Sequence, residues 1–278
     1  MNPLVSIIIV TNNSEKTLRQ AVDGVMTQTY ANMELLLCDT GSKDRSYLEP
    51  YQTYASTKVL FAGDNVGFCK GNNVGYSALD PASEYVFFLN PDAFLTPYWI
   101  EDAVTFMEKN SSYGALTGTT LGYDLQKNAP SGKYDTTGIF QNWYGKWRDR
   151  GQGANVDPHS YSKEEEIPAI CGAVYFARKR ALESCLLRNA EVFDSSFYMY
   201  KEDIDLSLRL KTKRWKIGFL PSLTAYHCRG WDPDRKKMPR NFRMLSAKNE
   251  LTIQWKSKKP LPILYSCLKV LSVKMFDI

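Results

Sequence analysis

Four short apolar runs in the N-terminal third of the chain each give way abruptly to polar or turn-forming residues. Between them lie stretches with helical spacing, such as Ser46–Ala55 and the apolar positions Leu18, Val22 and Val25 or Met26. This alternation predicts a mostly parallel α/β sheet of the nucleotide-binding type, flanked by helices. Because ligands bind beyond the carboxyl ends of such strands, we expect the polar ends to line a site. The four runs are Leu4–Val10, Met33–Cys38, Lys58–Phe61 and Tyr85–Leu89.

The fourth run ends most abruptly, in Asn90, Pro91 and Asp92. Asp92 can offer oxygen to a hard cation, and a cation held by one or two carboxylates and several waters is the usual means of binding a diphosphate. Asp39 ends the second run in the same way. Each has a plainer explanation, since Pro-Asp turns and Asx-turns commonly follow strands. The repetition of polar residues at four successive strand ends favours a binding site.

The third run leads into a segment rich in glycine and asparagine, Gly63–Asn73. Both residue types reach positive φ at low cost, and glycine lets the backbone come close to a ligand. The segment therefore suits a phosphate or a sugar, although it matches neither the Walker pattern nor the dinucleotide GxGxxG pattern. A loop that only caps the following helix is the alternative.

The composition is that of an ordinary globular protein, with 278 residues, 44% hydrophobic and 23% charged. This length suits one large α/β domain or a domain with an appendage. The chain reaches its first apolar run without a basic segment, so we expect no secretory signal. No apolar run approaches the roughly 18 residues of a membrane span. Six scattered cysteines without CxxC spacing indicate reduced, mostly buried thiols in a cytosolic protein.

The positive charge is concentrated at the C-terminal end of the chain. From Arg229 to Ile278 the sequence holds twelve Lys and Arg against four Asp and Glu, a net charge of +8, so the preceding residues carry −3 of the total of +5. We therefore expect this segment to meet acidic partners, either phosphates or anionic lipid, and we expect no nucleic-acid partner.

Two parts of this basic segment have separate interpretations. The stretch Asp234–Arg240 resembles a basic loop able to neutralise a diphosphate. Beyond Pro260 a helix is predicted with one apolar side and with Lys269 and Lys274 nearby, an arrangement that resembles a helix lying at a membrane interface. Packing of that side against the core is the alternative. The apolar positions are Ile263, Leu264, Cys267, Leu268, Leu271 and Met275.

The stretch 123–166 is polar, glycine-rich and interrupted, and it contains Trp143 and Trp147. Aromatic faces stack on sugar rings, so this insertion can shape an acceptor site. The same aromatics can instead form the small core of a long loop. Strand character resumes at Ile170–Phe176, where Gly172 permits a close backbone approach.

A second group of candidate residues lies at the start of a predicted helix. Glu202, Asp203 and Asp205 occupy its first turn, where the helix dipole favours anions, so a purely structural role is open to all three. Asp205 has Arg209 four residues on, a standard helix-surface pair, and we assign Asp205 to structure.

The chain has two histidines. His227 follows a strand-like stretch and precedes Arg229 and Gly230, a context that suits a metal ligand or a diphosphate contact. An ordinary surface or core histidine is the alternative. We expect His159, in the polar insertion, to be a surface residue.

Five motifs of the chain resemble those of the inverting family-2 glycosyltransferases with the GT-A fold, most of all the rhamnosyltransferase-like members. The resemblance runs from about Leu4 to about Asn249; each motif alone is weak, and five in the expected order are specific. The motifs are Val10-Thr11-Asn12-Asn13, Cys38–Asp44, Asn65–Asn73, Leu89-Asn90-Pro91-Asp92 and Glu202-Asp203-Ile204-Asp205-Leu206.

The resemblance implies a role for each matching residue. Asp203 would be the general base and Glu202 would help to position the acceptor, while Asp92 and His227 would hold Mg²⁺ or Mn²⁺. The family's usual Asp-x-Asp is Asn90-Pro91-Asp92 here, so an amide replaces the first carboxylate. The residues implied for the nucleotide and the donor are Thr11, Asn13, Asp39, Asn65, Gly67, Gly71, Asn73, Asn90 and Arg229, and those for the acceptor are Gly172, Trp143 and Trp147.

The resemblance thus implies an inverting, metal-dependent hexosyltransferase. It would move rhamnose from dTDP-rhamnose, or otherwise a hexose from a UDP-sugar, to a saccharide or lipid-linked saccharide in cell-surface polysaccharide biosynthesis. It would act in the cytoplasm, with the inner membrane face as a place of peripheral attachment. The expected domains are a GT-A domain over 1–228, with a donor half to about 122 and an acceptor half from about 123, and a basic extension over 229–278 that closes the site and can associate with a membrane.

Two other functional classes stay open. A sugar-1-phosphate nucleotidyltransferase also combines a related sheet with diphosphate chemistry, but the basic glycine-rich loop expected after its first strand is replaced here by Thr11-Asn12-Asn13-Ser14. A non-catalytic module that binds nucleotide sugars would bind the donor without acceptor-dependent release of nucleotide.

Overall fold

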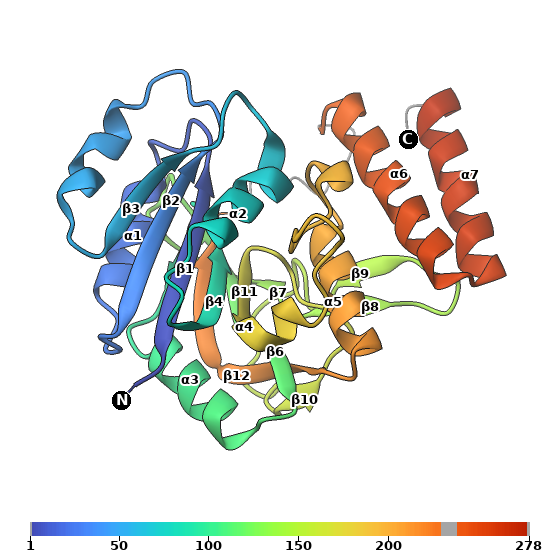
Figure 1. The fold of residues 1–278 in the computed structure, drawn as a ribbon. Helices are drawn as coiled ribbons and strands as arrows, with labels where there is room; N and C mark the ends of the chain where they lie inside the picture. The colour runs from blue at the N-terminus through green and yellow to red at the C-terminus, as the bar shows by residue number, and fades with distance from the viewer. Residues whose placement is uncertain (1, 229–237, 277–278) are drawn as a thin grey trace.

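The computed structural model describes residues 2–228 and 238–276. Its first four long strands are parallel and lie in the order β4-β1-β2-β3, so their carboxyl ends meet at one edge of the sheet (Figure 1). The elements of this part are β1 (Leu4–Thr11), α1 (Leu18–Met26), β2 (Met33–Asp39), the 3₁₀ helix η1 (Ser46–Thr53), β3 (Thr57–Phe61), α2 (Gly67–Ser77) and β4 (Ser83–Leu89).

Beyond β4 the sheet contains strands of both directions. β11 runs antiparallel between β4 and β6, and β12 lies parallel to β6. The short strands β5 and β10 both pair with β12, and β7 pairs with β6. β8 and β9 form a separate hairpin. The elements are β5 (Ala93–Leu95), α3 (Trp99–Lys109), β6 (Tyr113–Asp124), β7 (Ala129–Thr136), β8 (Ile139–Gln141), β9 (Trp147–Asp149), β10 (Glu165–Glu166), β11 (Val174–Arg178), α4 (Lys179–Glu183), η2 (Ser195–Phe197), α5 (Glu202–Thr212) and β12 (Lys216–His227).

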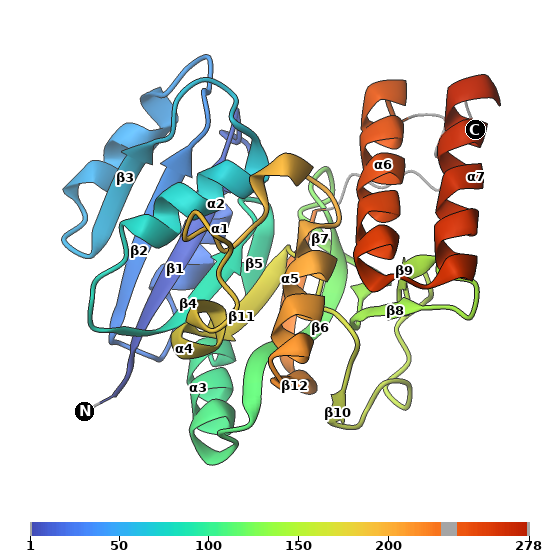
Figure 2. The same ribbon diagram turned by 45° about the vertical axis from the view of Figure 1, so that its right-hand side comes forward.

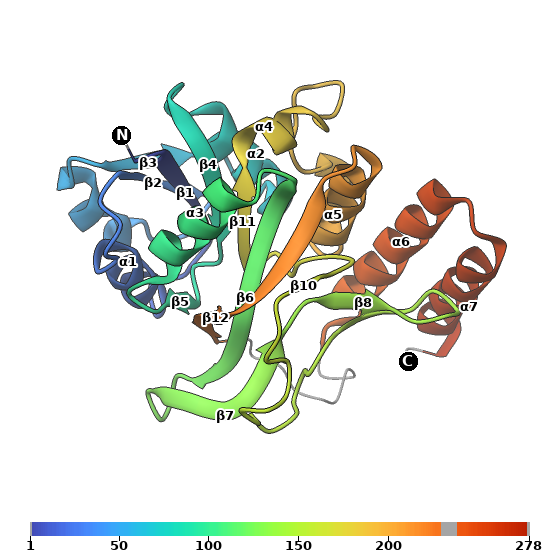
Figure 3. The same ribbon diagram turned by 90° about the horizontal axis from the view of Figure 1, so that it is seen from below.

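Helices cover both faces of the sheet, with α1 and α3 on one face and α2, α4 and α5 on the other (Figure 3). Trp99 of α3 stacks on Phe87 of β4, and Gly75 of α2 lies against Ile8 of β1. Strands buried on both faces carry continuous apolar runs rather than alternating ones. This two-sided burial explains why the fourth run, and the first apart from Ser6, read as continuous apolar sequence.

The C-terminal helices α6 (Arg240–Ser257) and α7 (Pro260–Phe276) form an antiparallel pair beside the sheet (Figures 1 and 2). α6 packs on α5 and α7 packs on α6. α7 also meets the β8–β9 hairpin, where the Tyr144 and Tyr265 rings lie 5.0 Å apart. Among the described helices none is both long enough and apolar enough to cross a bilayer.

Buried polar side chains of α6 connect these helices to the hairpin. Glu250 accepts a hydrogen bond from the Trp147 backbone N–H at 3.3 Å and forms an ion pair with Lys269 of α7. Gln254 donates to the Gly145 carbonyl oxygen at 2.6 Å and accepts from the Gln141 amide at 3.1 Å. The hairpin, α6 and α7 are therefore one hydrogen-bonded unit.

The predicted mixed α/β architecture is confirmed, and the differences are local. The predicted helix near Ser46 is a 3₁₀ helix containing Pro50, which lacks the N–H that an α-helix would use. The glycine- and asparagine-rich segment is helical from Gly67 onward, and the strand expected from Ile170 begins at Val174. None of the six cysteines, all of which lie in the described residues, forms a disulfide, and five of them are buried.

Candidate active site

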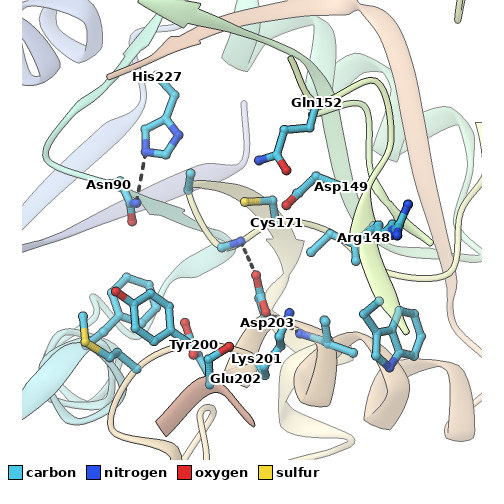
Figure 4. Close-up of a pocket in the computed structure, with 18 of the residues that line it drawn as sticks. Asn90, Arg148, Asp149, Gln152, Cys171, Tyr200, Lys201, Glu202, Asp203 and His227 are labelled. Atoms are coloured by element: carbon cyan, nitrogen blue, oxygen red, sulfur yellow. Dashed lines mark hydrogen bonds between the residues drawn. The ribbon is translucent and has the colours of Figure 1, made fainter. Parts of the chain in front are cut away.

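A cavity of about 720 Å³ lies where the carboxyl ends of β4 and β12 approach the start of α5 and the β8–β9 hairpin (Figure 4). Side chains from all these elements line it. The cavity therefore brings together residues from distant parts of the chain that were predicted for the donor, the metal, the base and the acceptor. Those that line it are Asn90, Asp92, Trp147, Gly172, Glu202, Asp203 and His227.

His227, the last residue of β12, lies between two carboxylates. Its Nε2 is 3.2 Å from Asp92 Oδ1 and its Nδ1 is 2.9 Å from Asp135 Oδ2. Burial alone would lower the pKa of His227, but hydrogen bonds with Asp135 and Asp92 and the charges of both raise it to about 9. The pairing of β12 with β5 places His227 beside Asp92, because His227 is the strand partner of Ala93, the residue after Asp92.

Asp92 and His227 are the best candidates for a metal site. Within residues 2–228 and 238–276 no cluster of three or more His, Cys, Asp or Glu side chains could hold a metal. Two protein ligands nevertheless suit Mg²⁺ or Mn²⁺, which keep several waters and bind substrate phosphates. If His227 bound the metal through Nε2, Asp135 would accept a hydrogen bond from Nδ1 and so fix the orientation of the imidazole ring. Because a ligating imidazole is neutral, a bound cation would displace the proton from Nε2.

Asp203 faces the cavity from the first turn of α5. Its Oδ2 accepts a hydrogen bond from the Gly172 backbone N–H at 2.9 Å, and its Oδ1 accepts one from the Ile204 N–H at 2.8 Å (Figure 4). The predicted close approach at Gly172 is thus to Asp203, whose Cβ would lie 3.4 Å from a Cβ at residue 172. Burial raises the pKa of Asp203, and this effect exceeds the lowering by the two N–H hydrogen bonds. A fixed carboxylate with a raised pKa suits a proton acceptor.

Glu202 is buried beside Asp203. Its Oε2 makes no hydrogen bond with any part of the chain that the structure describes. Burial, followed by the negative charge of Asp203, raises the pKa of Glu202 to about 8. Near neutral pH this carboxyl group therefore holds its proton and can donate a hydrogen bond. The two adjacent acids differ in their hydrogen bonds: two backbone N–H groups bind Asp203, whereas Glu202 Oε2 has no partner among the described residues.

The backbone just before Glu202 is strained, since several residues there have the left-handed conformation that non-glycine residues rarely adopt. They are Tyr198 (φ 60°), Tyr200 (φ 70°) and Lys201 (φ 75°). We call this segment, residues 197–201, the base loop. The buried side chain of Asn249 from α6 holds it in place. Its Nδ2 lies 2.9 Å from each of the carbonyl oxygens of Phe197, Met199 and Tyr200.

The base loop also contacts two predicted donor residues. The Tyr198 hydroxyl donates to Asn65 Oδ1 at 2.6 Å. The Tyr198 ring lies over Gly67, where a Cβ would come within 2.5 Å of a ring carbon. Gly67 also has a φ of +82°, so both its conformation and its neighbour require glycine. The donor segment and the base loop are therefore held together.

The residues predicted for the nucleoside lie at the ends of β1 and β2, where Thr11 pairs in register with Asp39. Thr11 Oγ1 is 2.8 Å from the Tyr47 hydroxyl. Asp39 accepts hydrogen bonds from two N–H groups of the following turn and from Arg45 Nε at 3.0 Å, so the Asx-turn is present. Asn13 joins the two strand ends by accepting from the Lys43 N–H at 2.9 Å. Their contacts with a nucleoside stay a prediction.

Gly71 and Asn73 serve the packing of α2. A Cβ at Gly71 would lie 2.7 Å from a methyl of Val10. Asn73 exchanges hydrogen bonds with the backbone of Phe193, donating at 2.8 Å and accepting at 3.0 Å. Neither residue lines the cavity, and their contact with a donor stays a prediction.

The two tryptophans of the hairpin have different surroundings. Trp147 is buried and lines the cavity. Trp143 is 82% exposed, packs on Tyr144 and does not line it. Arg229 and most of the predicted basic loop fall outside the described residues.

The expected pairing of Asp205 with Arg209 is present, but the expected surface position of Asp205 is wrong. Its ion pair with Arg209 is present at 2.8 Å, but Asp205 is only 3% exposed rather than on the surface. Lys256 of α6 contacts its other oxygen at 2.7 Å. The pair is buried because α6 covers this side of α5. His159 is exposed, as expected.

Sequence reasoning missed Asp135 and Asn249. Asp135 is one acid in a polar insertion, and only the pairing of β7 with β6 brings it to His227. Asn249 lies in a helix without a motif of its own, and its three carbonyl partners are about fifty positions earlier in the chain. No local signal marks either residue.

The family model described as glycosyl transferase family 2 matches residues 6–155. The chain is 24% identical over 246 residues to N-acetylglucosaminyl-diphospho-decaprenol L-rhamnosyltransferase of Mycobacterium tuberculosis, covering 82% of this chain and 76% of the relative. It is 30% identical over 145 residues to an uncharacterised glycosyltransferase of Haemophilus influenzae, covering 50% of this chain and 44% of the relative. The aligned part therefore spans less than half of that relative's length.

Two solved structures have a similar fold. One is GalNAc-T7 crystallised with UDP, GalNAc and Mn²⁺, with a TM-score of 0.69 and 16% identity, covering 90% of this chain and 47% of that one. The other is S. aureus TarS 1–349 in complex with UDP, with a TM-score of 0.54 and 16% identity, covering 97% of this chain and 70% of that one.

The sheet order, the flanking helices and the carboxylates at one edge of the sheet define an α/β protein of the GT-A type. Because the family model covers more than half of the chain, the chain belongs to glycosyl transferase family 2. The family membership expected from the five sequence motifs is confirmed.

Proposed function

We propose that this chain is an inverting glycosyltransferase that moves a sugar from a nucleoside diphosphate to a hydroxyl of a saccharide or lipid-linked saccharide, in cell-surface polysaccharide biosynthesis. dTDP-rhamnose is the favoured donor, because a relative aligned over most of the chain is named a rhamnosyltransferase; a UDP-hexose is next, because both similar structures hold UDP. One observation carries the proposal: Asp92, His227 and Asp203 line the same cavity.

Asp203 would act as the general base. It would take the proton of the acceptor hydroxyl while that oxygen bonds to the anomeric carbon and the bond from this carbon to the diphosphate breaks. Attack opposite to the leaving group inverts the configuration. Its raised pKa makes Asp203 a stronger base than an exposed aspartate, and the Gly172 and Ile204 N–H groups fix its orientation.

Asp92 and His227 would hold Mg²⁺ or Mn²⁺ beside the diphosphate, with Asp135 orienting the imidazole. The bound cation would stabilise the negative charge of the departing diphosphate. Glu202, protonated near neutral pH, would donate a hydrogen bond to an acceptor oxygen. The basic extension would close the site at the cytoplasmic face of a membrane, where a lipid-linked acceptor is met.

Nucleotide release tests this function. The full chain is incubated with dTDP-rhamnose or UDP-hexoses, with and without Mg²⁺ or Mn²⁺, and donor binding is followed by thermal stabilisation. We expect stabilisation that requires the cation and nucleotide release that requires a saccharide acceptor. Asp92→Asn should remove the cation dependence, with the exposed Asp102→Asn as the matched control. Stabilisation without acceptor-dependent release would favour a binding module, and diphosphate release from a nucleoside triphosphate with a sugar 1-phosphate would favour a nucleotidyltransferase.

A further inference from the structure

The outward face of α7 is apolar, and nothing in residues 2–228 and 238–276 covers it. One side of the helix, with Pro262, Ser266 and Val273, is buried, and this side packs on α6 and, at Pro262, on Gly145 of the hairpin. α6 lies between α7 and the sheet (Figure 2). The opposite side carries large exposed side chains at alternating spacings of three and four, which form one stripe along the helix. They are Leu261, Leu264, Leu268, Leu271 and Met275, and we call them the outer stripe.

The exposed charges of α6, α7 and the turn between them, apart from those in ion pairs, have one sign. Between Met238 and Phe276 the only acidic residue is Glu250, which is buried and paired with Lys269. Lys256 is exposed but pairs with Asp194 and Asp205. The other exposed charges of this stretch are all positive: Arg240, Lys248, Lys258, Lys259 and Lys274.

Two exposed tryptophans border the two-helix unit. Trp255 lies in the last turn of α6 and is 67% exposed. Trp143 is at the turn of the hairpin and packs on Tyr144, whose ring in turn meets Tyr265 of α7. Tryptophan is favoured at membrane–water interfaces, where its ring meets both apolar and polar surroundings.

We propose that the outer stripe of α7 docks on an anionic phospholipid bilayer. An apolar helix face with a rim of lysine and arginine is the pattern of a helix that lies in the interface, with cations on lipid phosphates. A second copy of the chain would bring two positive rims together, which opposes association. α7 would lie on the bilayer rather than across it, since no described helix is both long enough and apolar enough to span.

This inference deepens the proposed function, since a lipid-linked acceptor would be met at the same surface. Ser246 of α6 and Lys269 of α7 line the cavity, while the outer stripe faces away from α6. The docking face and the cavity wall therefore belong to one unit. Docking itself needs no sugar transfer, so the two proposals can fail separately.

Vesicle co-sedimentation of the full chain tests the docking. We expect binding to vesicles of phosphatidylglycerol and phosphatidylcholine, weakened by salt, and little binding to phosphatidylcholine alone. Leu264→Ser/Leu268→Ser should lower the partition coefficient about tenfold or more, because two apolar side chains no longer enter the bilayer. Lys258→Glu/Lys259→Glu should lower binding to the anionic vesicles by a similar factor.

Matched controls change exposed residues elsewhere. Leu125→Ser, in the turn between β6 and β7, and Lys163→Glu should bind like the unchanged protein. Thermal unfolding should be unaltered in all four variants, since every replaced side chain is exposed. Unchanged binding in Leu264→Ser/Leu268→Ser would overturn the proposal. So would a protein that ignores anionic vesicles and forms a dimer which this variant dissociates, a result that assigns the outer stripe to a second copy.

Discussion

Glu202 and Asp203 are neighbours in sequence, yet their carboxyl groups have different surroundings. Asp203 accepts two N–H hydrogen bonds and faces the cavity, whereas Glu202 Oε2 is buried without a partner among the described residues. The two N–H donors stabilise the ionised form of Asp203, the form that can accept a proton, and Glu202 Oε2 has no such donor. The proton acceptor and the hydrogen-bond donor are therefore assigned to different side chains.

Asp203→Asn keeps the size of the side chain but removes its ability to accept a proton. We expect turnover to fall by about 10²–10⁴ with donor affinity nearly unchanged. Acceptor-dependent nucleotide release and donor binding measure the two effects, with Asp102→Asn as the exposed control. Near-normal turnover would move the base to another residue.

Glu202 makes the stability of the fold depend on pH. Its pKa is about 8 in the folded protein, against about 4.5 for an ordinary glutamic acid, so between these values the folded state retains a proton that the unfolded state releases. The stability from protonated Glu202 is complete below about pH 4.5 and is lost as pH rises toward about 8. Glutamine imitates the protonated form.

The free energy of unfolding of Glu202→Gln should therefore exceed that of the unchanged protein by a margin that grows with pH between these values. Chemical denaturation at several pH values measures this margin. A margin that is constant with pH would show that Glu202 titrates normally.

At the level of elements, α6 is the part that connects the site to the C-terminal end. It holds the base loop through Asn249, the hairpin through Glu250 and Gln254, and α5 through Lys256. A strained loop persists only where its surroundings fix it. α6 therefore positions Glu202 and Asp203, although it supplies neither.

Asn249→Ala should release the base loop. We expect turnover to fall about tenfold or more with donor affinity little changed, because misplacing a catalytic group affects the chemical step. Stability should fall by about 1–3 kcal/mol, since buried carbonyl groups lose their donor. Asn241→Ala, on an exposed position of α6, is the matched control. If turnover and stability of Asn249→Ala match those of this control, the side chain does not hold the loop.

At the level of the whole molecule, what the sequence predicted was local. Strand and helix periods are set by neighbouring residues, and so are polar groups at strand ends. Contacts between segments that are distant in the chain leave no such pattern in the sequence. Three of them depend on the folded arrangement: Asp135 with His227, Asn249 with the carbonyl groups of the base loop, and Lys256 with Asp205. Trp143 and Trp147 look equivalent in sequence, but only the hairpin's position against α6 buries Trp147.

The hydrogen bonds between the hairpin and α6 limit how this protein can be recombined. A chimaera joined near residue 228, with C-terminal helices from a relative, would bury the Gln141 amide and the Trp147 N–H against side chains not matched to them. Exchange of the helices together with residues 139–149 keeps each buried donor with its acceptor. We therefore expect a chimaera to take on the acceptor preference of the relative only when it receives both the C-terminal helices and residues 139–149 from that relative.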